Sequence, residues 1–228
     1  MSFSYSEPRP AISIECVVLS IVDQRLMCCL QRRTEPPFAE QLSLPGQALK
    51  LEQDLPTAAK TVCREVTQSE LVWLEQLPIL GDIGRDPRGR ALSIGFLACL
   101  REEANHVPTT TNGHEWMELP LKEPLAFDHD KHLAHATTRL QHGVRTDRLA
   151  FELLPKQFPF RTLQSTFEVL LGRTLDKRNF RKKILATKIV KELAVREQGT
   201  SHRAAQLFEF QRSEFDRQQA SGELIDFA

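Results

Sequence analysis

The sequence predicts a first domain with α+β or α/β layering, followed by a winged helix-turn-helix domain. Three observations lead to this fold class. Strand-like and helical segments alternate over residues 1–148, a helix, a tight turn, a second helix and a hairpin follow in residues 149–228, and positive charge is concentrated in that second part. We expect these two ranges to be the domains, since 228 residues suffice for two small ones.

The zero net charge of the chain is a cancellation between its parts. Lys plus Arg and Asp plus Glu each number 30, which by itself argues against a polyanion partner. However, residues 1–150 carry a net charge of −4, residues 151–217 carry +6, and the last eleven residues carry −2. This partition is the expected footprint when only one part of a protein binds a polyanion.

The composition excludes several other classes of protein. Met1–Pro10 is polar and lacks the apolar centre of a signal peptide, and no apolar stretch approaches the length of a membrane helix. The five cysteines include no C-x-x-C pair, which argues against a zinc ribbon or a redox dithiol. We expect a cytoplasmic protein with reduced thiols and no contact with a membrane.

The first part begins with a hairpin. Ile12–Ile21 is rich in Ile and Val, Asp23-Gln24 is a turn signal, and Arg25–Leu30 supplies the partner strand. A helix is expected over Leu55–Glu70, because its apolar positions recur at helical spacing and a proline lies in its first turn.

Further strands and a second helix follow. Strands are expected at Leu77–Leu80, Ala91–Leu100 and His114–Leu121. Asp128 is a helix-capping residue, and we expect the helix to run to Gln141 and to stop at Gly143.

The second part has the order of a winged helix. A helix from Thr162 ends at Gly172, and a second helix with Asp176 as its N-cap runs to Ala186. Strands at Ile189–Val195 and Ala205–Phe210 flank a turn at Gly199–Ser201. A helix, tight turn, helix and hairpin form a winged helix-turn-helix.

The helix after Asp176 is unusually basic. Leu175, Phe180 and Ile184 are its candidate core residues, so the basic residues project elsewhere. Basic side chains neutralise phosphates, and in the major groove Arg pairs with guanine and Asn with adenine. The residue types of this helix therefore favour DNA binding over the alternative, a helix face that is merely solvated. The predicted DNA-binding residues, with two from the hairpin tip, are Arg173, Lys177, Arg178, Asn179, Arg181, Lys182, Lys183, Lys188, His202 and Arg203.

Residues 46–72 resemble a degenerate Nudix box, G-x5-E-x7-R-E-U-x-E-E-x-G-U. Gly46 and Glu52 keep the first spacing, but eleven residues rather than seven separate Glu52 from Arg64-Glu65. The two metal-binding glutamates of the box fall on Gln68 and Ser69.

The altered box predicts weak or absent catalysis. Residues at i, i+3 and i+4 share a helix face, so Glu65, Gln68 and Ser69 should point the same way and offer one carboxylate of three to Mg²⁺. We expect no catalytic residue and no required cofactor, with Mg²⁺ relevant only to residual hydrolysis. The alternative for Glu65 is a surface glutamate of the helix, and for Arg64 a structural ion pair; these readings are favoured over a functional role.

Two further features concern ligands. The loop Gly81–Arg90 carries arginines among glycines, and Arg85, Asp86, Arg88 and Arg90 are the candidate effector-binding residues because Arg forks onto phosphate oxygens; a solvated turn is the alternative. His129, His132 and His135 share one helix, but their spacing favours an exposed face over a metal site, and we predict no metal.

The chain as a whole resembles the Nudix-related transcriptional regulators of the NrtR type, over about Ile12 to Phe210. The degenerate box, the GRDPRGR loop at Gly84–Arg90, Ala126–His129 and the run LGRTLDKRNFRKKI at Leu171–Ile184 carry the resemblance. It implies a Nudix-fold sensor, which is an α+β domain built as an α/β/α sandwich with a mixed sheet, for ADP-ribose or a related nucleotide or sugar phosphate. The sensor would be fused to a winged helix that binds palindromic double-stranded DNA as a homodimer. Members typically repress genes of NAD metabolism, and others regulate sugar catabolism.

Three functions therefore compete. The preferred hypothesis is a ligand-responsive transcriptional repressor. The alternatives are an active Nudix hydrolase, an ADP-ribose pyrophosphatase with a basic extension, which would release AMP in a Mg²⁺-dependent reaction, and a nucleotide-binding adaptor without affinity for DNA.

Overall fold

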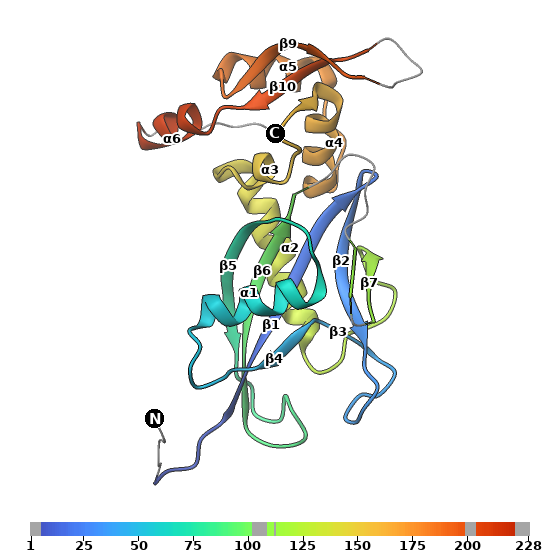
Figure 1. Ribbon diagram of the computed structural model, residues 1–228, viewed down its shortest axis with the longest axis vertical. Coiled ribbons are helices and arrows are strands. Elements are labelled where there is room, and N and C mark those ends of the chain that lie inside the picture. The colour runs from blue at the N-terminus through green and yellow to red at the C-terminus, as the bar shows by residue number, and fades with distance from the viewer. Residues whose placement is uncertain (1–5, 102–108, 112, 199–203, 222–228) are drawn as a thin grey trace. The chain divides into compact units, whose positions relative to one another are not determined.

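The computed structural model describes residues 6–101, 109–111, 113–198 and 204–221 (Figure 1). The chain divides into two compact units. The first comprises Met1–Leu19, Cys28–Cys99 and Thr109–Ala136, and the second comprises Ser20–Met27, Leu100–Pro108 and Thr137–Ala228.

The first unit is built on a mixed sheet of seven strands. Its main path runs β3-β2-β1-β6-β5, with β4 paired to β1 and β7 paired to β2. β1 and β6 are parallel, whereas β4 and β1 are antiparallel, as are β2 and β3. The strands are β1 (Ala11–Val22), β2 (Arg25–Arg32), β3 (Leu42–Ser43), β4 (Gly46–Ala48), β5 (Leu71–Leu80), β6 (Ala91–Leu100) and β7 (His114–Glu118).

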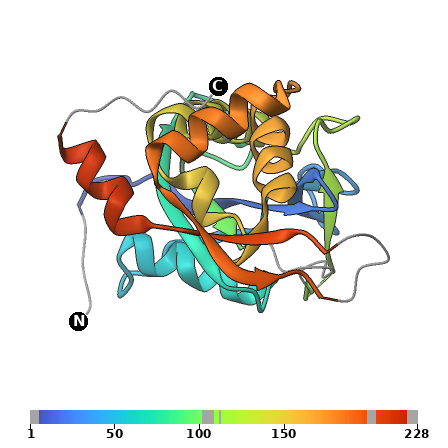
Figure 2. The same cartoon turned by 90° about the horizontal axis from the view of Figure 1, so that it is seen from above.

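Helices lie on both faces of this sheet. α1 (Leu55–Val66) packs on the face that contains Cys16, whose thiol donates to the carbonyl of Ala59. α2 (His129–Thr146) begins on the other face, where His132 contacts Ser93 of β6. Figures 1 and 2 show the sheet between these two helices, which confirms the predicted α+β sandwich with a mixed sheet.

The first hairpin agrees with its prediction in turn and strands. Asp23 and Gln24 have φ of 48° and 60°, the left-handed pair that a two-residue hairpin turn requires. The strand β5 is longer than predicted, and the short strands β3 and β4 were not predicted.

Both helices of the first part end elsewhere than predicted. α1 ends at Val66, because Thr67 is extended and the segment around Thr111 binds the carbonyls of Glu65 and Val66. The expectation that Gln68 and Ser69 share a helix face with Glu65 is therefore wrong.

α2 continues through the glycine that was expected to stop it. Gly143 is buried within the helix, and a Cβ there would lie 2.6 Å from Nη1 of Arg139. Arg139 pairs with Asp147 next to this position at 2.7 Å. The glycine makes room for an ion pair, which gives it a packing reason rather than a role in helix termination.

The second unit contains the predicted helix-turn-helix and hairpin. Its three-stranded sheet has the order β8-β10-β9, and Figure 2 shows β9 and β10 side by side. The predicted turn at Gly199–Ser201 lies outside the described residues. The elements are α3 (Leu149–Glu152), β8 (Phe158–Pro159), α4 (Phe160–Leu171), α5 (Lys177–Thr187), β9 (Val190–Arg196), β10 (Gln206–Phe210) and α6 (Arg212–Ala220).

The predicted signals around the helix-turn-helix are confirmed. Gly172 ends α4 in the left-handed conformation, with φ of 64°. Asp176 caps α5, and its carboxylate accepts from the backbone N–H of Asn179 at 2.8 Å. The short helix α3 and the terminal helix α6 carry no such signals and were not predicted.

Phenylalanine rings fill the core of the second unit. Phe167 lies 5.2 Å from Phe180 of α5 and 5.3 Å from Phe151 of α3, measured between ring centroids. Phe151 stacks on Phe210 at 4.7 Å. These contacts fix α5 against α4 and the sheet from its apolar side, leaving the polar side outward. Of the helices in the described part of the chain, none combines the length and apolar character needed to span a bilayer.

Candidate functional site

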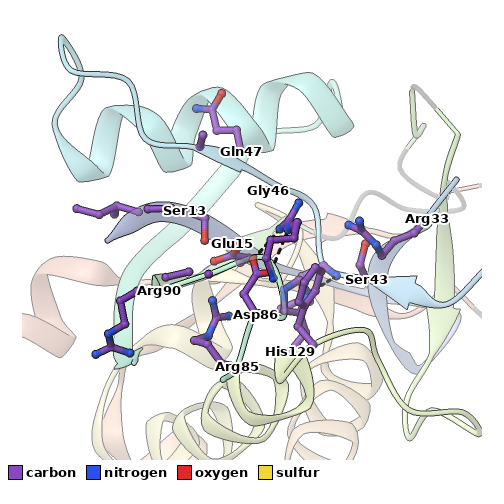
Figure 3. Close-up of a pocket in the computed structure, with 18 of the residues that line it drawn as sticks. Ser13, Glu15, Arg33, Ser43, Gly46, Gln47, Arg85, Asp86, Arg90 and His129 are labelled. Atoms are coloured by element: carbon purple, nitrogen blue, oxygen red, sulfur yellow. Dashed lines mark hydrogen bonds and ion pairs between the residues drawn. The ribbon is translucent and has the colours of Figure 1, made fainter. Parts of the chain in front are cut away.

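The first unit contains a cavity of about 580 Å³. Residues of β1 and β4 line it together with the loop Gly81–Arg90 and the start of α2, as Figure 3 shows. Its lining carries five arginines, namely Arg9, Arg33, Arg85, Arg88 and Arg90. Such a set of cations is suited to a polyanionic small molecule.

Small side chains form part of the wall that β1 and its neighbours contribute. In the sheet register Ala11 pairs with Ala91, Ser13 pairs with Ala48 of β4, and Gly46 pairs with Glu15. Laterally paired residues project on the same face of a sheet, so these positions leave space above the strands.

Gly46, the first residue of the degenerate box, has a structural reason to be glycine. A Cβ at this position would lie 2.6 Å from the carbonyl oxygen of Ile14 and 3.2 Å from Cγ of Glu15. Because the nearest atom belongs to the backbone, any larger residue here would require β4 or β1 to shift.

The arginines of the Gly81–Arg90 loop have different environments. The guanidinium of Arg85 forms a forked pair with Asp128, and the side chain of Arg85 is only 4% exposed. Arg88 pairs with Asp86 at 2.7 Å yet keeps 61% of its side chain exposed, and Arg90 donates to the carbonyl of Gly81 at 2.6 Å. All four predicted effector-binding residues of this loop line the cavity.

An aromatic ring also lines the cavity, one that the sequence analysis named only as part of the Ala126–His129 resemblance and to which it gave no role. Phe127 has φ of 57° and stacks with His129, with 5.4 Å between ring centroids. The guanidinium carbons of Arg33 and Arg88 lie 4.9 and 5.4 Å from the centre of its ring. Phe127 therefore orients two of the five cavity arginines by cation–π contact.

Two of the three histidines on α2 are buried, which corrects the expectation of an exposed face. His129 accepts through Nδ1 from the N–H of Leu44 at 3.1 Å, and burial is the main reason that its pKa falls to about 3. Burial likewise lowers the pKa of His132 to about 4. His135 is exposed, so the three imidazoles do not converge. Within the described ranges, no three His, Cys, Asp or Glu side chains are grouped to hold a metal ion.

Glu15 lies on the cavity wall between Ser13 and Gly46 (Figure 3). It is 7% exposed, and the Ser93 hydroxyl donates to its carboxylate. Ser93 Oγ lies 2.8 Å from Nε2 of His132, which completes a buried chain of three polar groups. Sequence reasoning missed this chain because its members belong to three separate elements.

The residues of the degenerate box do not fit a magnesium site. Glu52, Arg64 and Glu65 are exposed, and Glu65 lies in the last turn of α1. Because α1 ends at Val66, Gln68 and Ser69 follow in non-helical backbone and supply no carboxylate beside Glu65. Mg²⁺ needs several oxygen ligands in near-octahedral order, which this segment does not assemble.

The predicted DNA-binding residues lie mostly on the outer side of α5 and at its ends. Phe180 and Ile184 are buried, whereas Leu175 is half-buried. The guanidinium of Arg181 lies 4.6 Å from the centre of the Phe160 ring of α4 and 5.5 Å from that of Phe208 in β10, which holds this arginine toward the sheet. His202 and Arg203 are outside the described residues. The exposed members are Arg173, Lys177, Arg178, Asn179, Arg181, Lys182, Lys183 and Lys188.

Comparison with known proteins identifies the family. A family model for the NrtR DNA-binding winged helix domain matches residues 150–210. Over 214 residues the chain is 31% identical to the ADPR responsive transcriptional repressor NtrR of Acinetobacter baylyi, covering 92% of this chain and 85% of that protein. The chain belongs to the NrtR family.

Solved NrtR structures share the fold. Shewanella oneidensis NrtR, crystallised with a 27mer DNA, superposes with a TM-score of 0.75 at 23% identity over 90% of this chain and 95% of that one. The NUDIX domain of the same NrtR, crystallised with ADP ribose, gives a TM-score of 0.52 at 26% identity over 59% of this chain and 91% of that one. The first part is thus a Nudix-like domain, and the relative from Acinetobacter baylyi is a transcriptional repressor.

Proposed function

We propose that this NrtR-family protein is an ADP-ribose-responsive transcriptional repressor. One observation carries the proposal: a single chain combines an arginine-lined cavity in a Nudix-like unit with an exposed basic helix in a winged helix unit. The relative from Acinetobacter baylyi is an ADPR responsive repressor, which agrees with this combination.

The cavity supports a nucleotide diphosphate as the effector. Arg88 and Arg90 are exposed on the loop, and Arg33, which directly follows β2, also lines the cavity and lies 4.9 Å from the centre of the Phe127 ring. Guanidinium groups match phosphate oxygens, and a cavity of about 580 Å³ is within the range that holds a ligand of this size. A complex of the Shewanella oneidensis NUDIX domain with ADP ribose supports the same ligand class.

The winged helix unit supports duplex DNA as the partner. α5 presents Lys177, Arg178 and Lys182 on its exposed side, and Asn179 follows at its first turn. A helix with this surface fits the major groove, where Arg and Asn distinguish guanine and adenine. The wing and the basic residues beyond α5 would contact the phosphate backbone.

We further propose that residues 1–148 sense the effector and residues 149–228 bind DNA, in a homodimer on a palindromic operator. Two half-sites one helical turn apart require two winged helices at a fixed separation. An effector that binds better to a dimer with a different separation shifts the population away from the DNA-bound state. Genes of NAD metabolism are the proposed targets, because ADP-ribose, the proposed effector, is a part of the NAD molecule.

The cavity would serve sensing rather than hydrolysis. A Nudix hydrolase holds its metal with several carboxylates, whereas positions 68 and 69 of this chain are Gln and Ser in non-helical backbone after α1. We propose that the protein binds and releases ADP-ribose without hydrolysing it. Incubation of the protein with ADP-ribose and Mg²⁺ should therefore release no AMP.

The deciding experiment measures DNA binding with and without ADP-ribose. A labelled duplex from the promoter next to the gene is titrated with wild type, with Arg178→Ala/Lys182→Ala, and with the charge-matched control Lys60→Ala/Lys156→Ala. We expect the first double variant to lose binding and the control to keep it, with ADP-ribose releasing wild type from the duplex. Equal binding by both double variants contradicts the DNA assignment, and no response to ADP-ribose contradicts the effector.

A further inference from the structure

The cavity is cationic, yet a buried carboxylate forms part of its wall. Asp86, the other carboxylate in the lining, is bound by Arg88 through its guanidinium. Glu15 is held differently, by the hydroxyl of Ser93, and it is 7% exposed. A buried carboxylate held by a neutral group keeps capacity to accept further hydrogen bonds.

The hydrogen-bond directions can be assigned from His132. Its Nδ1 is buried and has no hydrogen-bond partner among the described residues, whereas Nε2 lies 2.8 Å from Ser93 Oγ. A proton on Nδ1 would be a buried donor without an acceptor, which is costly, so the proton belongs on Nε2. Nε2–H then donates to Ser93, and Ser93 donates to Glu15. This order leaves Glu15 as an acceptor.

Two glycines beside Glu15 keep its surroundings open. In the sheet register Glu15 pairs with Gly46 of β4 on one side and with Gly95 of β6 on the other. A Cβ at Gly46 would lie 3.2 Å from Glu15 Cγ, and a Cβ at Gly95 would lie 2.2 Å from Nδ1 of His132. One glycine thus leaves room beside the carboxylate, and the other leaves room for the imidazole that completes the chain.

We infer that Glu15 recognises a sugar hydroxyl of the effector, in a site where the arginines bind its phosphates. The inference rests on the proposed function and adds an orientation to it. A carboxylate accepts hydrogen bonds from hydroxyl groups and repels phosphate oxygens, so the phosphates bind near Arg88 and Arg90 and a ribose lies over Glu15. Glu15 is therefore a specificity-determining residue, and Ser93 with His132 fixes its carboxylate.

The test is a thermodynamic cycle between Glu15 and single ligand hydroxyls. Calorimetric titrations use ADP-ribose and two analogues, one without the 2-hydroxyl of the adenosine ribose and one without that of the terminal ribose. The proteins are wild type, Glu15→Gln and the control Glu115→Gln, an exposed carboxylate of the same unit that does not line the cavity. We expect one analogue to bind wild type and the control at least about tenfold more weakly than ADP-ribose, because a hydrogen bond to a charged group is lost.

In Glu15→Gln, the analogue that lacks this hydroxyl should bind no more than about threefold more weakly than ADP-ribose, because the charged acceptor of the hydroxyl is already absent. An unchanged penalty in Glu15→Gln, or no penalty for either analogue in wild type, overturns the inference and leaves the proposed function intact. Failure of wild type to bind ADP-ribose overturns the proposed effector and this inference with it.

Two further variants complete the design. If thermal melting shows that Glu15→Gln is unfolded, Glu15→Asp takes its place in the titrations. Asp keeps the charge but withdraws the carboxylate from the ligand, so the loss of affinity on removal of the ligand hydroxyl should again be smaller than in wild type. Ser93→Ala tests the positioning role: the hydroxyl penalty should shrink in Ser93→Ala and return in Ser93→Thr, which restores the hydroxyl. An unreduced penalty in Ser93→Ala shows that Ser93 does not position the carboxylate.

Discussion

Arg85 donates three hydrogen bonds to the carboxylate of Asp128, two from Nε at 3.1 Å and one from Nη2 to Oδ1 at 2.7 Å. Their side chains are 4% and 12% exposed. The pair joins the arginine-rich loop to the residue before α2, so it fixes one wall of the cavity. The guanidinium of Arg85 is used in this contact, which leaves Arg88 and Arg90 as the exposed cations of the loop.

Replacing Arg85 should destabilise the first unit. Arg85→Ala leaves the carboxylate of Asp128 buried without its partner, and loss of one member of a buried pair costs about 3–5 kcal/mol. Arg90→Ala, at an exposed position of the same loop, should change the free energy of unfolding little. Urea denaturation of both variants measures the difference. Equal stabilities would show that the forked pair is not an anchor.

Lowering the pH should destabilise the protein through His129 and His132. Their folded-state pKa values of about 3 and about 4 lie below the usual 6.5, so the unfolded chain takes up protons first. The free energy of unfolding should fall as the pH drops from about 6.5 toward 4, by up to about 1.4 kcal/mol per pH unit for each histidine. The pKa of Glu15 is raised by burial, so the folded protein takes up a proton at this carboxyl before the unfolded chain does. At pH values just above the usual pKa of a glutamate, lowering the pH therefore raises the contribution of Glu15 to the free energy of unfolding, which opposes the effect of the two histidines.

The contribution of His132 can be isolated by substitution. Denaturation at pH 7 and pH 5 should show a smaller loss in His132→Gln than in wild type. His135→Gln, which changes an exposed imidazole of the same helix, should keep the wild-type loss. The same loss in all three proteins would contradict a buried neutral His132.

DNA binding should depend steeply on salt, and the dependence should map to α5. Each phosphate contact contributes a slope of about −0.9 to the logarithm of the binding constant against the logarithm of salt concentration on duplex DNA. Lys182→Ala should reduce the magnitude of the slope by about 0.9, the value of one phosphate contact. Lys60→Ala on α1 should leave the slope unchanged. Fluorescence anisotropy over a salt series gives both slopes. A larger change of the slope in Lys60→Ala than in Lys182→Ala would indicate that DNA binds the first unit, and would contradict binding through α5.

The buried ring of Phe180, on the inner side of α5, should contribute strongly to the stability of the second unit. Phe180 is 3% exposed and lies 5.2 Å from Phe167 and 5.9 Å from Phe160 between ring centroids. Phe180→Ala should cost about 3–5 kcal/mol by loss of apolar burial and creation of a cavity. Leu185→Ala, on the partly exposed side of the same helix, should cost much less. Chemical denaturation compares the two, and similar costs would contradict the burial of Phe180.

Local signals accounted for most of what the sequence predicted. Gly172 and Asp176 act within one turn of their helices, so the boundaries of α4 and α5 could be derived from neighbouring residues alone. The first hairpin was predicted for the same reason, since its turn consists of the two adjacent residues Asp23 and Gln24, both with positive φ. The family resemblance added the Nudix-like fold, which the pattern of elements indicated only as a class.

Distant contacts account for what the sequence did not predict. α1 ends early because Thr111 binds its last carbonyls, and Gly143 remains helical because Arg139 and Asp147 pair beside it. The buried state of His132 depends on Gly95, which belongs to a strand 37 residues earlier in the sequence. No periodicity along one segment contains this information.

The second compact unit is assembled from three separate stretches, Ser20–Met27, Leu100–Pro108 and Thr137–Ala228. A transplant of residues 149–228 would therefore leave behind chain that belongs to the same unit. Residues 149–228 alone are therefore not expected to form a complete folding unit that can be fused to another sensor domain. A new operator preference is expected to come more readily from substitutions on the outer side of α5 than from recombination at a domain border.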